Sequence, residues 1–344
     1  MYFPWDRTWS RTHSQRIVLA ILSPFYLGHE AVLLFFVLSG FVLSLPYLQG
    51  REQSYPQFLL RRILRIYGPY CVALALAVGG VAIFHGHLGM GDWSEQTWSQ
   101  PVSRKLVLDH VLFLGNYNWF EYNVVFWSLV IEMRVSILFP LLVGLITRIR
   151  VGYAVLIAAA CPLLYRLAIH YRPSTEPTLL SLAYVSTFIA GIILAQHLSS
   201  VKGWYKVRSG WERMLFVATV LVLYCAGHLL PHLSQLATFL GTTGVIVIAL
   251  TSESAHRLLR LRVLRFLGRI SYSMYLVHVP VIFALVFLLH TRVSPMMMFF
   301  VYVALALGLA TVFNVLVEAP LIRLSHRVGR RSSNEESVLV GESV

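Results

Sequence analysis

Charge and cysteine are both scarce in this chain. Only 12% of its 344 residues are Asp, Glu, Lys or Arg, whereas 57% are hydrophobic. Together with a mean hydropathy of +0.70, this composition excludes an ordinary soluble globular protein. The three cysteines, Cys71, Cys161 and Cys225, lie far apart within apolar segments, so the sequence predicts neither a disulfide framework nor a zinc site. An integral membrane protein is the class that remains.

Acidic residues are fewer than basic ones: the chain has 15 Asp and Glu against 28 Lys and Arg, which gives a net charge of +13. The basic residues gather in short segments between apolar runs, as in cytoplasmic loops, so we infer no nucleic-acid binding. The histidines lack a paired ligand spacing, and we propose no metal. The N-terminal residues also lack the pattern of a cleavable signal peptide.

Long apolar runs dominate the chain. Their lengths predict an all-α fold, a polytopic transmembrane helical bundle of about nine spans. The predicted spans are 31–47, 67–84, 127–146, 151–169, 179–197, 214–230, 234–251, 271–289 and 296–317.

The distribution of Lys and Arg predicts the orientation of the bundle. Alternate connecting segments hold 19 of the 28 basic residues, which places those segments and the C-terminus in the cytoplasm. We expect a non-spanning segment over 1–30, a transmembrane domain over 31–322 and a disordered cytoplasmic tail over 323–344. The expected location is the plasma membrane, or the inner membrane of a bacterium.

The segment Trp127–Leu142 carries two charges inside an apolar run. A charge near the centre of a membrane helix costs roughly 2.5–3.5 kcal/mol on insertion scales, so Glu132 and Arg134 should have partners in the bundle. Residues four apart share a helix face, which aligns Ser128, Glu132 and Ser136, while Arg134 points elsewhere. Each charge is then expected to find its partner on another helix or in a polar cavity. Either these groups form a site or they hold helices together.

Two further segments offer candidate binding residues. Arg62 and Arg65 are three apart, so they are expected to share a face and could clamp a phosphate; the alternative is a basic anchor at the membrane interface. Ser39 and Gly40 supply small residues where another helix can approach, either for packing or for a substrate site. Glu30, just before that run, is expected to be solvated at the interface.

The longest predicted loop, 85–126, is rich in aromatic, amide and acidic residues. Such groups suit a sugar-like acceptor, because rings cover apolar faces and polar groups orient hydroxyls; an interfacial aromatic belt is the alternative. These residues are Trp93, Trp98, Asn116, Tyr117, Asn118, Trp119, Glu121 and Tyr122.

The last two runs carry polar residues at helical spacing. Ser271 is expected to cap the eighth run, and Tyr275 and His278 follow on the same face; His278 is either a titrating group or a core histidine. In the ninth run, Asn314 and Glu318 share a face. Pro320 is expected to end that helix.

Taken together, four segments and a closing motif make the sequence resemble the acyltransferase 3 family of integral membrane acyltransferases. They are FFVLSGF at 35–41, RRILRIYGPY at 61–70, WSLVIEMRVSILFPLL at 127–142, GRISYSMYLVH at 268–278 and VEAP at 317–320.

The resemblance implies a bundle of about ten helices that moves an acyl group, usually acetyl, from cytoplasmic acyl-CoA to a hydroxyl, commonly on a carbohydrate. It implies that Arg62 and Arg65 are the family's basic pair, which would meet the phosphates of the acyl-CoA donor, that Glu132 is the acid of its WSLxxE element and that His278 belongs to its GxxSYxxYLxH element. Glu132, Arg134, which could stabilise negative charge, and His278 are expected to support catalysis. Acceptor-binding residues are expected to be Ser39, Ser128, Tyr275 and Trp119. The family places its presumed catalytic histidine in a first helix that nothing before Gly28 reproduces, so we expect an upstream segment to be absent from this chain and activity to depend on it.

Two functions of other classes stay open from the sequence. A transporter or flippase would use the buried charges to line a substrate path, although no inverted repeat is visible. A non-catalytic membrane subunit would account for the missing first helix.

Overall fold

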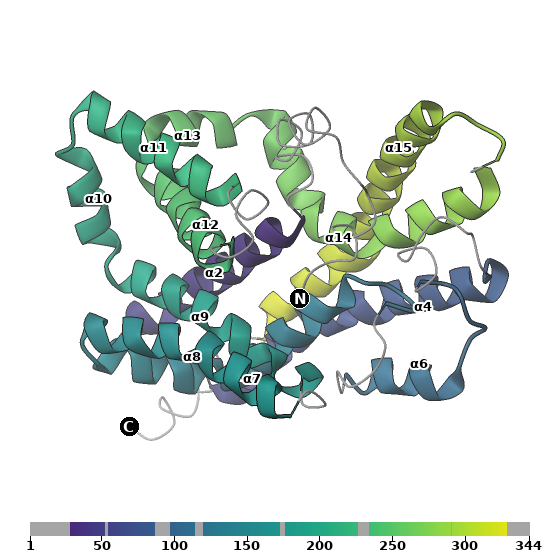
Figure 1. The fold of residues 1–344 in the computed structure, drawn as a ribbon, viewed down its shortest axis with the longest axis horizontal. Helices are drawn as coiled ribbons and strands as arrows, with labels where there is room; N and C mark the ends of the chain where they lie inside the picture. Colours follow the sequence, from purple (N-terminus) through teal and green to yellow (C-terminus); the bar gives the residue numbers. More distant parts are fainter. Residues whose placement is uncertain are drawn as a thin grey trace, which may run out of the picture. The chain divides into compact units, whose positions relative to one another are not determined.

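The computed structural model describes residues 28–51, 54–86, 97–113, 120–172, 176–225, 234–289 and 291–328. Within these ranges every regular element is a helix, which confirms the predicted all-α class (Figure 1). Most of the predicted N-terminal segment and most of the predicted tail lie outside the described residues.

Seven helices in the described ranges are long and apolar enough to cross a membrane. The pair Leu236–Thr251 and Glu253–Leu259 is an eighth candidate, bent by 89° at its break. The remaining predicted run, 214–230, coincides with α11 (Gly210–Cys225), whose 16 residues end at the edge of a described range. The polytopic bundle is therefore confirmed. The seven helices are Gly28–Leu48, Tyr55–Ile83, Phe126–Arg148, Val151–Tyr171, Leu179–Gln196, Arg262–Leu289 and Met296–Val328.

The chain divides into two compact units, and the boundary falls within α7 (Phe126–Arg148). The first unit comprises the described residues of Gln53–Ile137 and Arg262–Val344, and the second comprises those of Asp6–Glu52 and Leu138–Leu261.

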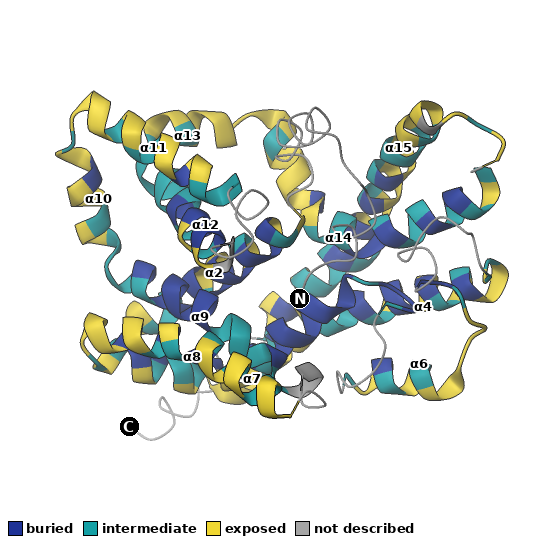
Figure 2. Cartoon of the chain, in the orientation of Figure 1, coloured by how far each residue is buried: buried dark blue, intermediate teal, exposed yellow. Residues whose placement is uncertain are grey.

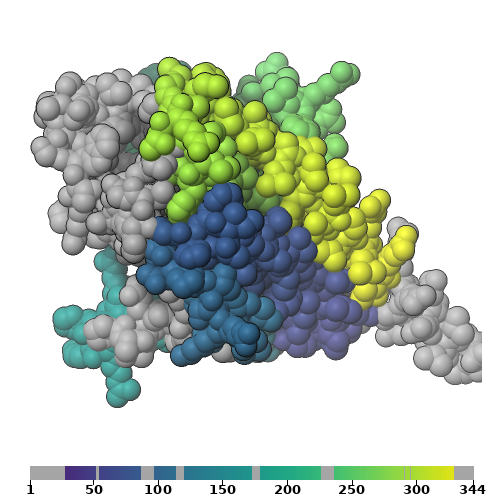
Figure 3. Space-filling model, turned by 90° about the vertical axis from the view of Figure 1, so that its right-hand side faces the viewer, coloured from purple at the N-terminus to yellow at the C-terminus, as the bar shows by residue number. Residues whose placement is uncertain are grey.

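In the first unit, α14 packs against both α4 and α15, and α4 also contacts η6. Figure 3 shows the yellow segment containing η6 beside the blue α4. Two of its elements, η3 and η6, are π-helical turns, which occur often at functional sites. Besides the start of α7, its elements are α3 (Tyr55–Arg62), η3 (Ile63–Tyr67), α4 (Gly68–Ile83), α6 (Arg104–Val111), α14 (Arg262–Leu289), α15 (Pro295–Phe313) and η6 (Asn314–Glu318).

Aromatic rings fill the core of the first unit. Tyr70 and Phe126 are fully buried with ring centroids 4.6 Å apart, and Trp98 lies 5.6 Å from Phe283. Gly80 makes room for the indole, because a Cβ at that position would lie 2.3 Å from Trp98 Cη2. A segment outside the helices is thus fixed into the bundle core.

The second unit is held by close backbone contact between helices. A Cβ on Gly40 would lie 2.3 Å from the Phe188 carbonyl oxygen, and one on Gly191 would lie 2.2 Å from the Val37 carbonyl oxygen. Small residues allow such an approach, and dispersion contacts then replace a hydrophobic driving force that lipid does not supply. Besides the rest of α7, its elements are α2 (Gly28–Leu48), α8 (Val151–Tyr171), α9 (Glu176–Gln196), α10 (Leu198–Lys206), α11, α12 (Ser234–Thr251) and α13 (Glu253–Leu259).

Helix α8 has one buried face and a wide exposed apolar surface (Figure 2). Ala154, Ala158 and Cys161 are its buried residues, and α8 packs against α9. Leu156 and Leu163 are each 65% exposed. Such a surface is compatible with lipid and not with water, as expected for an integral membrane protein.

Two predicted helix ends are wrong. Helix α14 begins at Arg262, so Ser271 lies inside it and its hydroxyl donates to the Gly268 carbonyl at 2.9 Å instead of capping an N-terminus. Pro320 does not end the last helix, which continues to Val328. The π-turn η6 directly before Pro320 explains this, because a widened turn accommodates a residue that lacks a backbone N–H.

Candidate functional site

A buried ion pair joins α3 to α7 in the first unit. Arg62 Nη2 lies 2.6 Å from Glu132 Oε1, and the side chains are 7% and 3% exposed. Arg62 Nε donates to Ser136 Oγ at 3.0 Å, and the Ser136 hydroxyl donates to the Glu132 carbonyl at 2.6 Å. The partner expected for Glu132 on another helix is thus Arg62. Removing two ions from water costs several kcal/mol per ion, and the attraction between them and these hydrogen bonds must offset that cost.

Ser128, one turn before Glu132, connects α7 to α14. Its hydroxyl lies 2.7 Å from the Tyr275 hydroxyl, and the Val125 carbonyl oxygen lies 3.1 and 3.2 Å from the two, so one hydroxyl donates to the other and the second donates to the carbonyl. The Tyr275 side chain also lies within electrostatic reach of Glu132. The predicted polar stripe on α7 is confirmed, and α14 and α3 supply its partners.

Arg62 and Arg65 do not share one environment. Arg62 is buried against Glu132, whereas Arg65 is exposed. The π-turn η3 begins directly after Arg62, and each residue of a π-turn advances through a smaller angle than in an α-helix. The expected shared face rests on α-helical spacing, which the π-turn alters between the two arginines.

Tyr272 on α14 connects η3 to the same region. Its hydroxyl donates to the Ile66 carbonyl inside the π-turn at 3.1 Å. The ring lies within electrostatic reach of the carboxylates of Glu132 and Glu318 and of both Arg62 and Arg65. Tyr272 therefore lies between the ion pair and a second buried acid.

That second acid, Glu318, belongs to η6. Its Oε2 accepts hydrogen bonds from the Ser273 hydroxyl and, at 2.9 Å, from Asn314 Nδ2. Asn314 Nδ2 also donates to the Arg269 carbonyl at 3.2 Å. The predicted shared face of Asn314 and Glu318 is confirmed. Their hydrogen bonds fix the end of the last span against α14.

The contacts of His278 define its neutral tautomer. Its Nδ1 lies 3.1 Å from the Met274 carbonyl oxygen and 2.9 Å from the Tyr275 carbonyl oxygen. Carbonyl oxygens only accept hydrogen bonds, so Nδ1 carries the proton and Nε2 of the neutral ring keeps its lone pair. His278 is half-buried. A half-buried imidazole with a basic Nε2 can accept a proton from a hydroxyl.

The other predicted site residues belong to different elements. Arg134 is half-buried on α7 in the first unit. Ser39 is 9% exposed on α2 in the second unit, next to the Gly40 contact. Trp119 lies outside the described residues.

The prediction that loop 85–126 presents aromatic and polar side chains to an acceptor is wrong for the residues that the structure describes. Trp98 is 1% exposed and Tyr122 is fully buried, with Trp98 Nε1 donating to the Tyr122 carbonyl at 3.0 Å. Glu121 is 5% exposed and accepts from the Gln100 backbone N–H at 3.0 Å. These groups complete their contacts inside the protein because the loop folds onto the first unit. The others in that set lie outside the described residues: Trp93, Asn116, Tyr117, Asn118 and Trp119.

Glu30 is a buried acid whose position the sequence analysis missed. It is 2% exposed in the first turn of α2, not solvated at an interface. It is near enough to Tyr224 and Cys225 for its charge to act on both side chains. Glu30 extends the buried stripe of Leu33 and Val37 at helical spacing, and that periodicity could have predicted its burial.

The arrangement in the first unit concentrates polar groups inside an apolar core. A carboxylate fixed by a guanidinium and flanked by hydroxyls can orient a substrate hydroxyl or respond to charge that develops nearby. A preorganised group of this kind acts strongly because the surroundings exclude water.

Comparisons with known proteins give a family match over most of the chain. A family model described as an acyltransferase domain matches residues 1–315. No curated protein and no solved structure matches the chain.

Proposed function

We propose, from the premise that the chain belongs to the acyltransferase 3 family, that it moves an acetyl group from cytoplasmic acetyl-CoA to a hydroxyl of a carbohydrate-like acceptor. Membership of the family makes the protein a membrane acyltransferase. The donor, the acetyl group and the class of acceptor are the proposed part.

The buried pair of Arg62 and Glu132 carries the proposal. A charge inside a membrane bundle is expensive and, by default, indicates function. Because Arg62 is engaged by Glu132 and Ser136, we assign it to positioning the carboxylate. Glu132 then orients the reacting groups, and Arg65, which is exposed, contacts the phosphates of the donor.

His278 is the base that we propose among the described residues, in place of the first-helix histidine on which the sequence led us to expect activity to depend. Nε2 of its neutral ring would take the proton of the acceptor hydroxyl while that oxygen attacks the thioester carbonyl carbon. A carbon–oxygen bond forms, the carbon–sulfur bond breaks, and coenzyme A leaves as a thiolate that takes up a proton. Arg134 would stabilise negative charge on the carbonyl oxygen.

Hydroxyl groups next to this base would hold the acceptor. Tyr275 lies on the turn before His278, with their ring centroids 6.0 Å apart, and its hydroxyl bonds Ser128. We assign both hydroxyls to acceptor binding. Ser39 and Trp119 are further acceptor contacts that we propose from the sequence pattern.

The proposed orientation places the C-terminus in the cytoplasm, where acyl-CoA is found. It rests on the bias of basic residues toward alternate connecting segments. Plasma membrane, or inner membrane in a bacterium, is the proposed location.

Acetyl transfer by the purified protein tests this proposal. Full-length protein in proteoliposomes is incubated with radiolabelled acetyl-CoA and a panel of carbohydrates, and labelled product is measured. We expect transfer in the wild type. His278→Gln should lower kcat by about 100-fold or more with little change in the affinity for coenzyme A, because removal of a general base affects only the chemical step.

His256→Gln is the matched control, because His256 is an exposed histidine on α13 outside the proposed site. It should retain wild-type turnover. If His278→Gln also retains wild-type turnover, the base lies elsewhere. Uptake of a carbohydrate into sealed vesicles without acetylation would identify a transporter instead.

A further inference from the structure

A second concentration of basic and aromatic residues lies in the second unit, at the corner between α10 and α11. The segment 198–213 contains four basic residues and one acid, Glu212. Trp204 and Trp211 are 42% and 66% exposed there. The four basic residues are Lys202, Lys206, Arg208 and Arg213.

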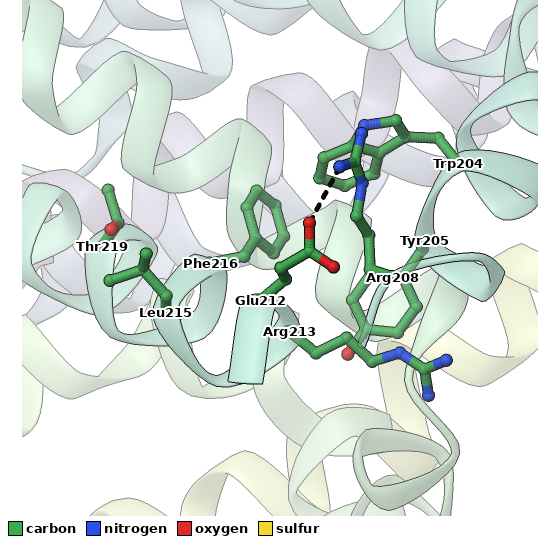
Figure 4. A pocket seen from close by; sticks show the side chains of 8 residues that line it. All are labelled: Trp204, Tyr205, Arg208, Glu212, Arg213, Leu215, Phe216 and Thr219. Carbon is green, nitrogen blue, oxygen red and sulfur yellow. Dashed lines mark hydrogen bonds and ion pairs between the residues drawn. The ribbon is translucent and has the colours of Figure 1, made fainter. Parts of the chain in front are cut away.

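This corner encloses a cavity of about 320 Å³. We call it the α10–α11 pocket. Figure 4 shows its lining side chains, which come from α10, the connecting turn and α11, with the Arg208 guanidinium by Trp204 and the Arg213 guanidinium past the Tyr205 ring. Its lining residues are Trp204, Tyr205, Arg208, Glu212, Arg213, Leu215, Phe216 and Thr219.

Both arginines of the pocket are fixed against aromatic rings. The guanidinium carbon of Arg208 lies 5.2 Å from the Trp204 ring centroid, and that of Arg213 lies 5.4 Å from the Tyr205 centroid. Arg213 Nη2 is also held by the Lys206 carbonyl at 2.8 Å. Within the described part of the chain, the buried Nε atom of neither arginine has a hydrogen-bond acceptor. Because solvent does not reach these Nε atoms, a ligand would contact the terminal N–H groups of the two guanidinium ions that Glu212 and the Lys206 carbonyl leave unengaged.

Glu212, the acid of the pocket, is already engaged. It accepts from the Ser209 backbone N–H at 2.8 Å, and the Glu212 N–H donates to Ser209 Oγ at 3.3 Å, which together form a capping box for α11. Arg208 Nη1 adds a contact at 2.9 Å. These hydrogen bonds, the backbone one first, lower the pKa of Glu212 to about 2. The carboxylate therefore stays ionised in the fold, and Arg213, Lys202 and Lys206 keep the corner positive.

The edge of the pocket is apolar. Val207 is 80% exposed, and Met214 and Leu215 are 57% and 55% exposed. Exposed apolar residues beside Trp and basic groups are typical of a protein surface at a membrane interface. A soluble anion would need only the charges, whereas this combination suits a ligand with a charged end and an apolar body.

We propose that the α10–α11 pocket binds the headgroup of an anionic phospholipid. The phosphate accepts from the donors of Arg208 and Arg213, Trp204 and Tyr205 lie at headgroup level, and the acyl chains cover Leu215 and its exposed neighbours. Basic residues next to a membrane attract anionic lipid in this way. None of the residues that we assign to acetyl transfer lines this pocket.

Lipid retention by the full-length protein tests the proposal. The protein is exchanged into nanodiscs of phosphatidylglycerol and phosphatidylcholine, extracted in mild detergent, and its bound lipids are counted by native mass spectrometry. We expect selective retention of phosphatidylglycerol. Arg208→Gln with Arg213→Gln should reduce that selectivity by about 25-fold, about fivefold for each charge.

The matched control is Arg257→Gln with Arg260→Gln, which removes two exposed charges from the α13 region and should keep the selectivity. Arg208→Lys with Arg213→Lys keeps the positive charge but removes the planar guanidinium, and it should retain most of the selectivity for phosphatidylglycerol. That result would also show that substitution at these positions leaves the corner folded. Equal retention of both lipids by the wild type overturns the proposal. Displacement of the lipid by coenzyme A or by inorganic phosphate at equal concentration would overturn it too, because the site would then serve a soluble anion.

Discussion

The two units of this protein use different chemistry to hold membrane helices together. In the first unit, side-chain polar groups connect the helices: Arg62 to Glu132, and Tyr275 to Ser128. In the second, glycines bring α2 and α9 into backbone contact, and Val37 and Phe41 of α2 pack in one apolar cluster with Ala190 and Leu194 of α9. Both solutions are stable in lipid, where small residues and interhelical hydrogen bonds stabilise association.

The difference shows where function lies. Glycine backbone packing joins α2 to α9, so a buried ion pair is not the only way in which this bundle can join two helices. Replacing a buried ion pair with apolar residues is often neutral or even stabilising. The pair in the first unit is therefore best explained by the acetyl transfer that we propose.

The largest effect is expected from breaking the ion pair. Glu132→Gln leaves the Arg62 charge buried without its counter-ion, which should destabilise the protein by about 3 kcal/mol and remove activity. Thermal unfolding in detergent and acetyl transfer measure the two effects. Arg62→Met with Glu132→Met should recover most of the stability without the activity, because no uncompensated charge remains. Wild-type turnover in that double variant would assign the pair to packing alone.

A smaller effect is expected from the glycine contact of the second unit. Gly191→Ala inserts a methyl group 2.2 Å from the Val37 carbonyl oxygen, so α2 and α9 must separate. Overpacking of this kind costs about 1–3 kcal/mol. The KM for acetyl-CoA of the folded fraction should not change. Gly144→Ala is the control, since no atom lies within 4 Å of the added Cβ, and it should stabilise α7 slightly. Equal unfolding temperatures for the two variants would contradict the backbone-contact explanation.

The smallest effect is local and depends on pH. His110 on α6 is fully buried, and burial, opposed by its hydrogen bond to the Leu106 carbonyl, lowers its pKa from 6.5 to about 4. Because the opened form binds the proton more tightly, local stability is fully present above pH 6.5 and decreases as the pH falls toward 4. Hydrogen exchange of peptides covering 104–111, corrected for intrinsic rates, should show more frequent opening at pH 5 than at pH 7. The His110→Gln variant has no imidazole to titrate, so its opening should not depend on pH. If the wild type has the same opening free energy at pH 5 and pH 7, the prediction is wrong.

Much of the architecture follows from the sequence. Apolar runs of membrane-spanning length predict a polytopic helical bundle, because an unpaired backbone is costly in lipid. The spacing of Ser128, Glu132 and Ser136 also predicts a polar stripe on α7, since helical periodicity requires no tertiary information. The stretch of the chain that carries the candidate site was thus identifiable at the start.

The tertiary structure alone decided which groups meet. Arg62 is 70 positions from Glu132, and no local pattern distinguishes it from Arg65. Burial distinguishes them in the fold, because Arg62 lies against Glu132 and Arg65 is exposed. The π-turn at Ile63–Tyr67 begins directly after Arg62, and the Tyr272 hydroxyl bonds to the Ile66 carbonyl within it. Composition could not reveal that the aromatic loop residues are core, because exposure is decided by where the loop folds. Periodicity within one helix is a property of the chain itself, whereas the partner across an interface is set by the whole bundle.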